Sequence, residues 1–353
     1  MTLTNQINSP NANPAQHAVP LPRHILIGYW HNWHAQPTRF IRLKDISRGY
    51  DVINVAFATS KGDAAGSMTF EPCAGTSVEE FKADIAALHR LGKKIVISAG
   101  GANGSAEIAD QRAQENFVAS MSAIIREYGF DGIDINLERK VILEAGDRDF
   151  KRPTSPSITN LVAAIRKIRD NFCPDFIVSM APETVCVQGG FATYGGVWGS
   201  YLPVIDALRD ILTYVHVQHY NSGTMLALDG QNYSQGTADF HVAMAEMLLH
   251  GFPINGDPAN VFPMLRPEQI AIGLPALANA ANAGYTVPAE VQKALNYLTM
   301  GQPFGGHYAL RCPEGYPGLR GVMTWSINWD ATSSQQFSSA TRSYLDMLLY
   351  PPT

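Results

Sequence analysis

The chain lacks the features of membrane-spanning and nucleic-acid-binding proteins. No apolar run reaches the roughly 18 residues that a membrane-spanning helix needs. The 26 basic side chains are outnumbered by 31 acidic ones, so the net charge is −5 and offers no attraction for a polyanion. We therefore expect neither a membrane nor a nucleic acid as a partner, and an uncharged substrate fits this composition better.

Cysteine is also scarce. The chain has only four, Cys73, Cys173, Cys186 and Cys312, and none has the Cys-x-x-Cys spacing of a zinc site. Free thiols and one or two disulfides are both compatible with these spacings. Histidines near the predicted strand ends have no second ligand at metal spacing, so the sequence predicts neither a metal nor another cofactor.

Apolar side chains make up 46% of the 353 residues, which is enough for a large core. Residues 1–22 are rich in Asn, Pro, Ala and Gln and lack the basic region and apolar block of an ordinary signal peptide. We expect a flexible segment over residues 1–22 and one folded domain over residues 23–353.

Eight short runs dense in Ile, Val and Phe predict strands that are buried on both faces. They cover residues 24–29, 51–58, 94–99, 132–137, 176–181, 214–220, 269–274 and 321–327. Apolar periodicity predicts helices between them, over residues 77–91, 106–128, 157–171, 201–212, 237–249, 288–298 and 333–349. The alternation predicts a single α/β domain, a (β/α)8 TIM barrel. A doubly wound open sheet is the alternative, but the first strand lacks its glycine fingerprint.

The most informative segment is Phe130–Glu138, where acidic or amide side chains alternate with apolar ones. Alternate residues of a strand face the same side, so Asp134, Asn136 and Glu138 would form one row. Burying such a row is costly unless its members are hydrogen-bonded or take part in chemistry. The row ends where the strand would meet a loop, and that is where an α/β barrel keeps its active site.

The carboxyl ends of the other predicted strands carry mainly aromatic, amide and carboxylate side chains. They include Tyr29, Trp30, His31, Trp33, Met180, Glu183, Gln218, Tyr220, Asn221, Trp325 and Trp329. Aromatic rings stack on the apolar faces of pyranose sugars, and polar groups bind the hydroxyls. We therefore predict a sugar-binding cleft, with the aromatic side chains of residues 189–199 as one wall.

Four motifs resemble those of glycoside hydrolase family 18, the chitinases and related endo-β-N-acetylglucosaminidases. They are Ser98–Gly101 on the third predicted strand, Asp131–Glu138 on the fourth, Gln218–Asn221 on the sixth and Trp325 on the eighth. The segment Gly28–Trp33 resembles bacterial members. The resemblance extends from Ile25 to about Asp330, nearly the whole predicted barrel.

The resemblance implies substrate-assisted hydrolysis with retention of configuration. Glu138 would protonate the glycosidic oxygen while the substrate's 2-acetamido oxygen attacks the anomeric carbon and forms an oxazolinium ion. Glu138 would then act as the base for the incoming water. Tyr220 would hydrogen-bond the acetamido oxygen, and Trp325 would lie under that sugar. Asp131 and Asp134 would raise the pKa of Glu138 through their charges.

Two further groups of residues are expected around these. Substrate contacts are predicted for Tyr29, Trp30, Met180, Glu183, Gln218, Asn221 and Trp325. Structural support of the acidic row is predicted for Asp131, Ser98, Gly100 and Gly101, because small residues let the row pack.

One position departs from the family pattern, which has Asp two residues before the acid where this chain has Asn136. That Asp would orient the acetamido group and stabilise the positive oxazolinium, whereas Asn136 can accept the acetamido N–H but carries no charge. Losing one such contact costs ~2–4 kcal/mol, or on the order of 10²–10³ in rate. Endo-β-N-acetylglucosaminidases of family 85 use Asn in this role, so the mechanism is not abolished. A slow or specialised natural enzyme, an engineered slow variant and a carbohydrate binder are all compatible with Asn136.

Only Pro275–Arg320 lies between the last two predicted strands, which is too short for the insertion of deep-cleft family members. We therefore expect an open cleft and an endo-acting chitinase on β-1,4-linked N-acetylglucosamine chains, secreted and monomeric. The alternatives are an endo-β-N-acetylglucosaminidase on N-glycan cores, and a weakly active or inactive chitin-binding lectin or inhibitor on the same barrel.

Overall fold

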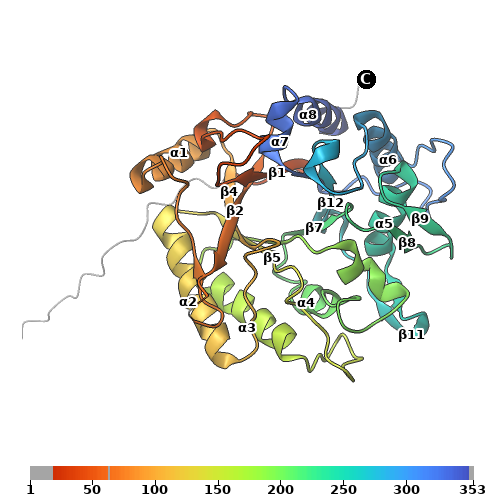
Figure 1. The fold of residues 1–353 in the computed structure, drawn as a ribbon. Helices are drawn as coiled ribbons and strands as arrows, with labels where there is room; N and C mark the ends of the chain where they lie inside the picture. Colours follow the sequence, from red (N-terminus) through yellow and green to blue (C-terminus); the bar gives the residue numbers. More distant parts are fainter. Residues whose placement is uncertain (1–18, 63, 350–353) are drawn as a thin grey trace, which may run out of the picture.

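The computed structural model describes residues 19–62 and 64–349, and its centre is a closed barrel of parallel strands (Figure 1). The strands follow one another around the ring in chain order, and the last pairs with the first. They are β1 (Ile25–His31), β2 (Val52–Ser60), β4 (Lys94–Gly100), β5 (Gly132–Asn136), β6 (Ile177–Met180), β7 (Tyr214–Gln218), β12 (Ile270–Pro275) and β13 (Gly321–Trp325). The predicted (β/α)8 barrel is confirmed, and the described residues contain no large insertion between β12 and β13. Residues 1–18 of the predicted N-terminal segment lie outside the described residues.

Helices surround the barrel (Figure 1). They are α1 (Val78–Arg90), α2 (Gln111–Tyr128), α3 (Pro156–Asp170), α4 (Leu202–Ala207), α5 (Ala238–His250), α6 (Pro288–Met300), α7 (Ile327–Thr332) and α8 (Gln336–Leu349). Local sequence sets their ends: Ser77 and Glu80 form a capping box before α1, and Gly129 ends α2 in the left-handed conformation. None of the described helices is long and apolar enough to cross a bilayer.

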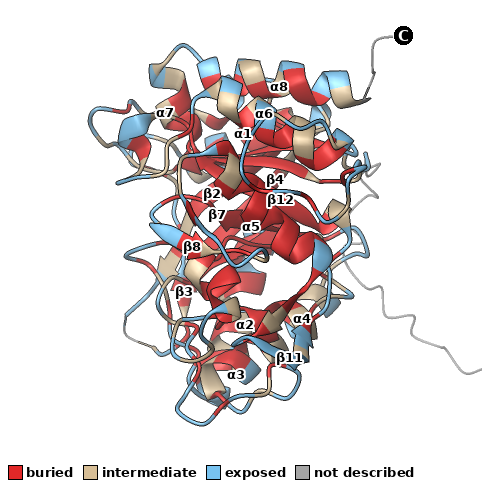
Figure 2. Cartoon of the chain, turned by 90° about the vertical axis from the view of Figure 1, so that its right-hand side faces the viewer, coloured by how far each residue is buried: buried red, intermediate tan, exposed pale blue. Residues whose placement is uncertain are grey.

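The strands of the barrel are mostly buried (Figure 2), and their side chains belong to two separate apolar clusters. On β5, Ile133 and Ile135 face outward into the core between strands and helices, while Asp134 and Asn136 face the barrel interior. The interior contains a second, smaller apolar cluster that includes Ile27. On β5 the period-2 alternation therefore carries polar groups into the barrel while its outward-facing residues are apolar.

The structure also contains short elements that the sequence patterns did not predict. The eighth strand ends at Trp325 because the Ser326 hydroxyl accepts a hydrogen bond from the Trp329 N–H and begins α7. A short strand, β3 (Met68–Thr69), pairs with the end of β2. Two further antiparallel pairs are β8 (Thr224–Leu226) with β9 (Asn232–Ser234), and β10 (Phe252–Ile254) with β11 (Asp257–Phe262). Strands this short have no extended hydrophobic pattern that could reveal them.

Candidate active site

A cleft of about 540 Å³ opens at the carboxyl ends of the barrel strands. This is the face on which parallel α/β barrels hold their active sites. The cleft brings together most of the residues predicted for the site, namely Gly100, Gly101, Asn136, Glu138, Glu183, Gln218, Tyr220, Asn221 and Trp325. These residues come from β4, β5, β6, β7 and β13 or the loops that follow them, so the closure of the barrel is what assembles them.

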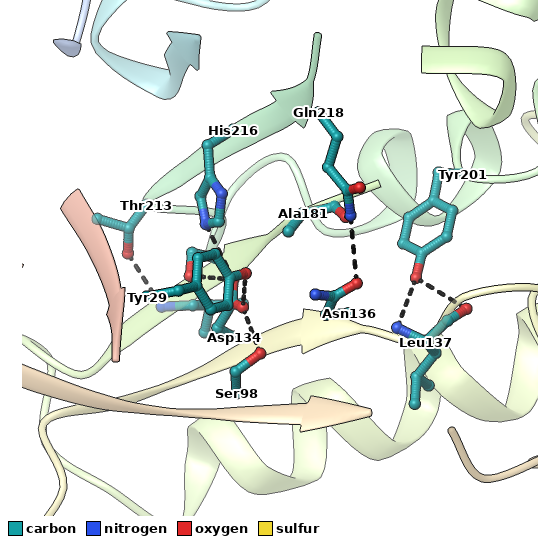
Figure 3. A network of polar contacts seen from close by, with 12 residues as sticks. Tyr29, Ser98, Asp134, Asn136, Leu137, Ala181, Tyr201, Thr213, His216 and Gln218 are labelled. Atoms are coloured by element: carbon teal, nitrogen blue, oxygen red, sulfur yellow. Dashed lines mark hydrogen bonds and ion pairs between the residues drawn. The ribbon is translucent and has the colours of Figure 1, made fainter. Parts of the chain in front are cut away.

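Asp134 lies beneath the cleft and is completely buried. Its carboxylate is bonded by the Tyr29 hydroxyl at 2.5 Å, the Ser98 hydroxyl at 2.7 Å, the Ser179 hydroxyl at 2.8 Å and His216 Nε2 at 3.0 Å (Figure 3). Burial alone would raise the pKa of Asp134. The charge and hydrogen bond of His216, with the bonds from Tyr29 and Ser98, outweigh that effect and hold the pKa below its ordinary value. Asp134 is therefore a fixed negative charge with no free lone pair aimed at the cleft.

Asn136 is the next inward-facing residue of β5 and borders the cleft, although only 4% of it is exposed. The Gln218 amide nitrogen donates to Ala181 O at 2.9 Å and lies 3.4 Å from Asn136 Oδ1 (Figure 3). The Ala181 carbonyl orients the Gln218 amide, and Gln218 in turn orients Asn136. The side-chain oxygen of Asn136 is thereby held in a defined direction at the base of the cleft.

Glu138 follows β5 and is partly exposed in the cleft. Partial burial, followed by the charge of Glu183, raises the pKa of Glu138 above its ordinary value. A hydrogen bond from Gln218 and the charge of Arg139 oppose this shift but do not cancel it. A carboxyl group with a raised pKa remains protonated at higher pH, as a general acid requires.

Tyr220 projects from the end of β7 and borders the cleft. Burial, and then the charges of Glu138, Glu183 and Asp134, raise the pKa of Tyr220 well above its ordinary value. Its hydroxyl therefore keeps its proton and can donate a hydrogen bond. Trp325 also borders the cleft, at the end of β13.

Aromatic rings extend the cleft from Trp325 toward β1 and β2. The rings of Trp325 and Phe57 stack with centroids 5.9 Å apart and planes 15° apart. The rings of Phe57 and Trp33 stack at 6.1 Å and 22°. The three side chains form an apolar surface along one side of the cleft, suited to the faces of consecutive sugar rings.

Phe57 was missed by the sequence analysis. Strict alternation along β2 would turn this side chain away from the interior, because Asn54 and Ala56 are the inward-facing residues. The pairing of β2 with β4 shifts by one residue between Ala56 and Ala58, and such a bulge re-aims the side chain beside it. The strand-end rule alone could have marked Phe57, since β2 ends at Ser60.

Residues 25–344 match the family model of the glycosyl hydrolases family 18. The chain belongs to glycosyl hydrolase family 18. It is 52% identical over 338 residues to chitinase Chi52 of Paenibacillus xylanexedens and 54% identical over 325 residues to chitinase D of Niallia circulans. These matches cover 96% and 92% of this chain but 64% and 62% of the relatives, so the chain spans less than two thirds of their length. The crystal structure of a family 18 chitinase from Chromobacterium violaceum is 40% identical with a TM-score of 0.85, covering 95% of this chain and 86% of that one.

Three of the predicted substrate contacts are not at the surface of the cleft of this family 18 barrel. Trp30 faces outward from β1, is 1% exposed, and donates its indole N–H to Ile41 O at 2.7 Å. Met180 is completely buried in the same outer layer. Both predictions are wrong, because a residue near a strand end reaches the cleft only when its side chain points into the barrel. Tyr29 does face inward, but it lies below the cleft and bonds Asp134.

Asp131 and Asp134 were expected to raise the pKa of Glu138, but the neighbouring charge that raises it is that of Glu183. The position of Asp131 explains why it has no such effect. It precedes β5 and lies at the opposite end of the strand from Glu138. Its carboxylate accepts from Ile95 N at 2.7 Å and contacts His89 Nε2 at 2.8 Å. Asp131 therefore supports the structure by joining α1 and β4 to the start of β5.

Three remaining predictions concern the loop expected as a wall of the cleft, the state of the cysteines and metal binding. The aromatic loop 189–199 does not line the cleft, and Trp198 on it is 39% exposed elsewhere on the surface. The four cysteines are free thiols in the structure. Across residues 19–62 and 64–349, no group of three His, Cys, Asp or Glu side chains is arranged to hold a metal ion.

Gly100 shows why small residues are required beside the acidic row. Its φ is +115°, and a Cβ there would lie 2.2 Å from the backbone oxygen of Asn136. We expect Gly100→Ala to lower the free energy of unfolding by about 3–5 kcal/mol, from backbone strain and overpacking together. Gly75→Ala is the matched control, since Gly75 has φ +91° but open space around its Cβ position, and should lose only about 1–2 kcal/mol. Urea unfolding measures both, and equal losses would contradict the packing argument.

Proposed function

We propose that this protein is a chitinase, an endo-acting glycoside hydrolase that cleaves β-1,4 linkages between N-acetylglucosamine units with retention of configuration. The observation that carries the proposal is the meeting of Glu138, Tyr220 and Trp325 in one cleft of a family 18 barrel. The names of the similar proteins, which are chitinases, support the choice of substrate.

Glu138 begins the proposed reaction as an acid. Its proton passes to the glycosidic oxygen, the bond from that oxygen to the anomeric carbon breaks, and the substrate's acetamido oxygen forms a bond to the same carbon. The Tyr220 hydroxyl donates to the acetamido oxygen and holds it for in-line attack. The Glu138 carboxylate then takes a proton from the attacking water, which opens the oxazolinium and restores the acid. Trp325 lies under the reacting sugar.

In this proposal Asn136 stands where the family pattern has an Asp two residues before the catalytic acid. Its side-chain oxygen, directed by Gln218, accepts the acetamido N–H and so aligns the nucleophile. It contributes no negative charge to the oxazolinium, so we propose that the step is slower than it would be with Asp.

An endo mode is supported by the openness of the cleft. The segment between β12 and β13 adds α6 but no domain that would roof the cleft, among the residues that the structure describes. A chain that can lie across the site without threading an end can be cut internally. Because chitin is an extracellular polymer, we also propose that the protein acts outside the cell. We further propose that it acts as a monomer.

Hydrolysis of an N-acetylglucosamine hexamer tests the proposal. We expect mixed products of two, three and four sugars, formed first as the β-anomer, which chromatography and proton NMR can follow. Dimers alone would mean an exo mode. No turnover of oligomers at high enzyme concentration would overturn the proposal. Release of glycans from a glycoprotein would then indicate an endo-β-N-acetylglucosaminidase, and binding without turnover a lectin.

A further inference from the structure

The charge balance of the cleft leaves one carboxylate unexplained. Among the described residues that line it, Glu138 and Glu183 are the two with carboxyl groups, and lysine and arginine do not occur there. Asp134 is below the cleft, with its oxygens occupied by buried donors. Glu138 must be protonated when the reaction begins, so Glu183 is the lining residue that can carry negative charge at that moment.

Glu183 is held rigidly at this position. It follows β6 and forms a parallel bridge with Gln218, whose N–H donates to Pro182 O at 2.9 Å. The Thr184 hydroxyl donates to Gln218 O at 2.6 Å, which fastens the residue after Glu183 to the same strand end. The side chain of Gln218 also contacts Asn136, so Gln218 is joined to Glu183 through its backbone and to Asn136 through its amide.

The Glu183 side chain is partly exposed and lines the same cleft as Glu138, and its charge raises the pKa of Glu138. None of the ion pairs among the described residues includes Glu183. A carboxylate without a cationic partner, in a cleft that excludes part of the solvent, interacts strongly with any positive charge that develops nearby.

We infer that Glu183 is a catalytic residue whose carboxylate stabilises the positive charge of the oxazolinium, supplying from β6 the charge that Asn136 on β5 does not. The inference rests on the proposed function. It assigns two effects to one group: Glu183 keeps Glu138 protonated before the first proton transfer, and it stabilises the cationic intermediate after it. No covalent bond to Glu183 forms at any stage.

Glu183→Gln removes the charge and keeps the shape. We expect kcat on the hexamer to fall by about 10²-fold while KM changes by less than about three-fold, because the lost interaction is made mainly after proton transfer. The basic limb of the pH–rate profile should move to lower pH, since Glu138 loses a neighbouring negative charge. Glu183→Asp should retain most of the activity, and the exposed Glu79→Gln on α1 is the control. Circular dichroism verifies the fold of each variant.

A second variant makes the test specific. Asn136→Asp in the Glu183→Gln background returns one carboxylate to the cleft and should raise kcat by more than about 10²-fold. Three results would overturn the inference: a change in KM alone for Glu183→Gln, an unchanged basic limb of its pH–rate profile, or no recovery of kcat when Asn136→Asp is added. Failure of the proposed function is a different result, because the unmodified protein would then not cleave the hexamer at all.

Discussion

Replacing Glu138 by Gln is expected to lower kcat on chitin oligomers by about 10³–10⁴-fold. An amide cannot donate the proton that the leaving oxygen needs, and it cannot take the proton of water in the second step, so both halves of the proposed reaction lose their acid–base group. The side chain is partly exposed and its replacement has nearly the same volume, so oligomer affinity should change little. Steady-state kinetics and calorimetric binding measure the two quantities separately.

Glu144→Gln is a suitable control, because Glu144 is exposed and lies in the loop that follows Glu138. It should leave kcat unchanged. The pH profile adds a second check: Glu138 acts as an acid only while protonated, so activity is lost as pH rises through its pKa. Since that pKa is raised, the basic limb should lie above the pH expected for an ordinary glutamate. A Glu138→Gln variant with activity within ten-fold of the unmodified protein would eliminate Glu138 as the acid.

The second large effect is expected for Asn136→Asp, which should raise kcat by about 10²-fold. The new carboxylate would accept the acetamido N–H in place of the amide oxygen and add negative charge next to the oxazolinium. It would also be a further like charge near Glu138, so the basic limb should move to higher pH. Rates on the same hexamer across a range of pH values measure both changes.

Asn136→Ala is the paired control, since it removes the acceptor as well as any charge and should lower kcat. An unchanged or lower rate for Asn136→Asp would mean that the amide is itself the evolved partner of the substrate. The gain should be larger when Glu183 is replaced by Gln, because one of the two charges is then absent. A gain of equal size in both backgrounds would show that positions 136 and 183 act independently.

The barrel was predictable because short apolar runs are separated by helical patterns, and because the side chains of a regular strand alternate between its two faces. On β5 this alternation also placed Asp134 and Asn136 on the inner face correctly. The same rule would have excluded Trp30, which follows the inward-facing Tyr29 and therefore points outward. Position at a strand end was thus an incomplete criterion, and the direction of the side chain had to be added to it.

Other features depend on geometry that no local pattern contains. The bulge in β2 that brings Phe57 to the cleft is a mismatch between two strands. The closeness of Glu183 to Glu138 arises from the pairing of β6 with its neighbours around the ring. The donors to Asp134 come from positions 36 to 105 residues away in the chain. Each of these contacts depends on closure of the barrel, and closure depends on the whole chain and not on any short segment of it.

The arrangement around Asp134 also bears on how this family 18 site can change during evolution. The buried carboxylate obtains all its partners from Tyr29, Ser98, Ser179 and His216, and none from the residue at position 136. An exchange between Asn and Asp at position 136 therefore removes none of the hydrogen bonds of Asp134. We therefore expect this barrel to accept either residue at position 136 without a compensating mutation around Asp134.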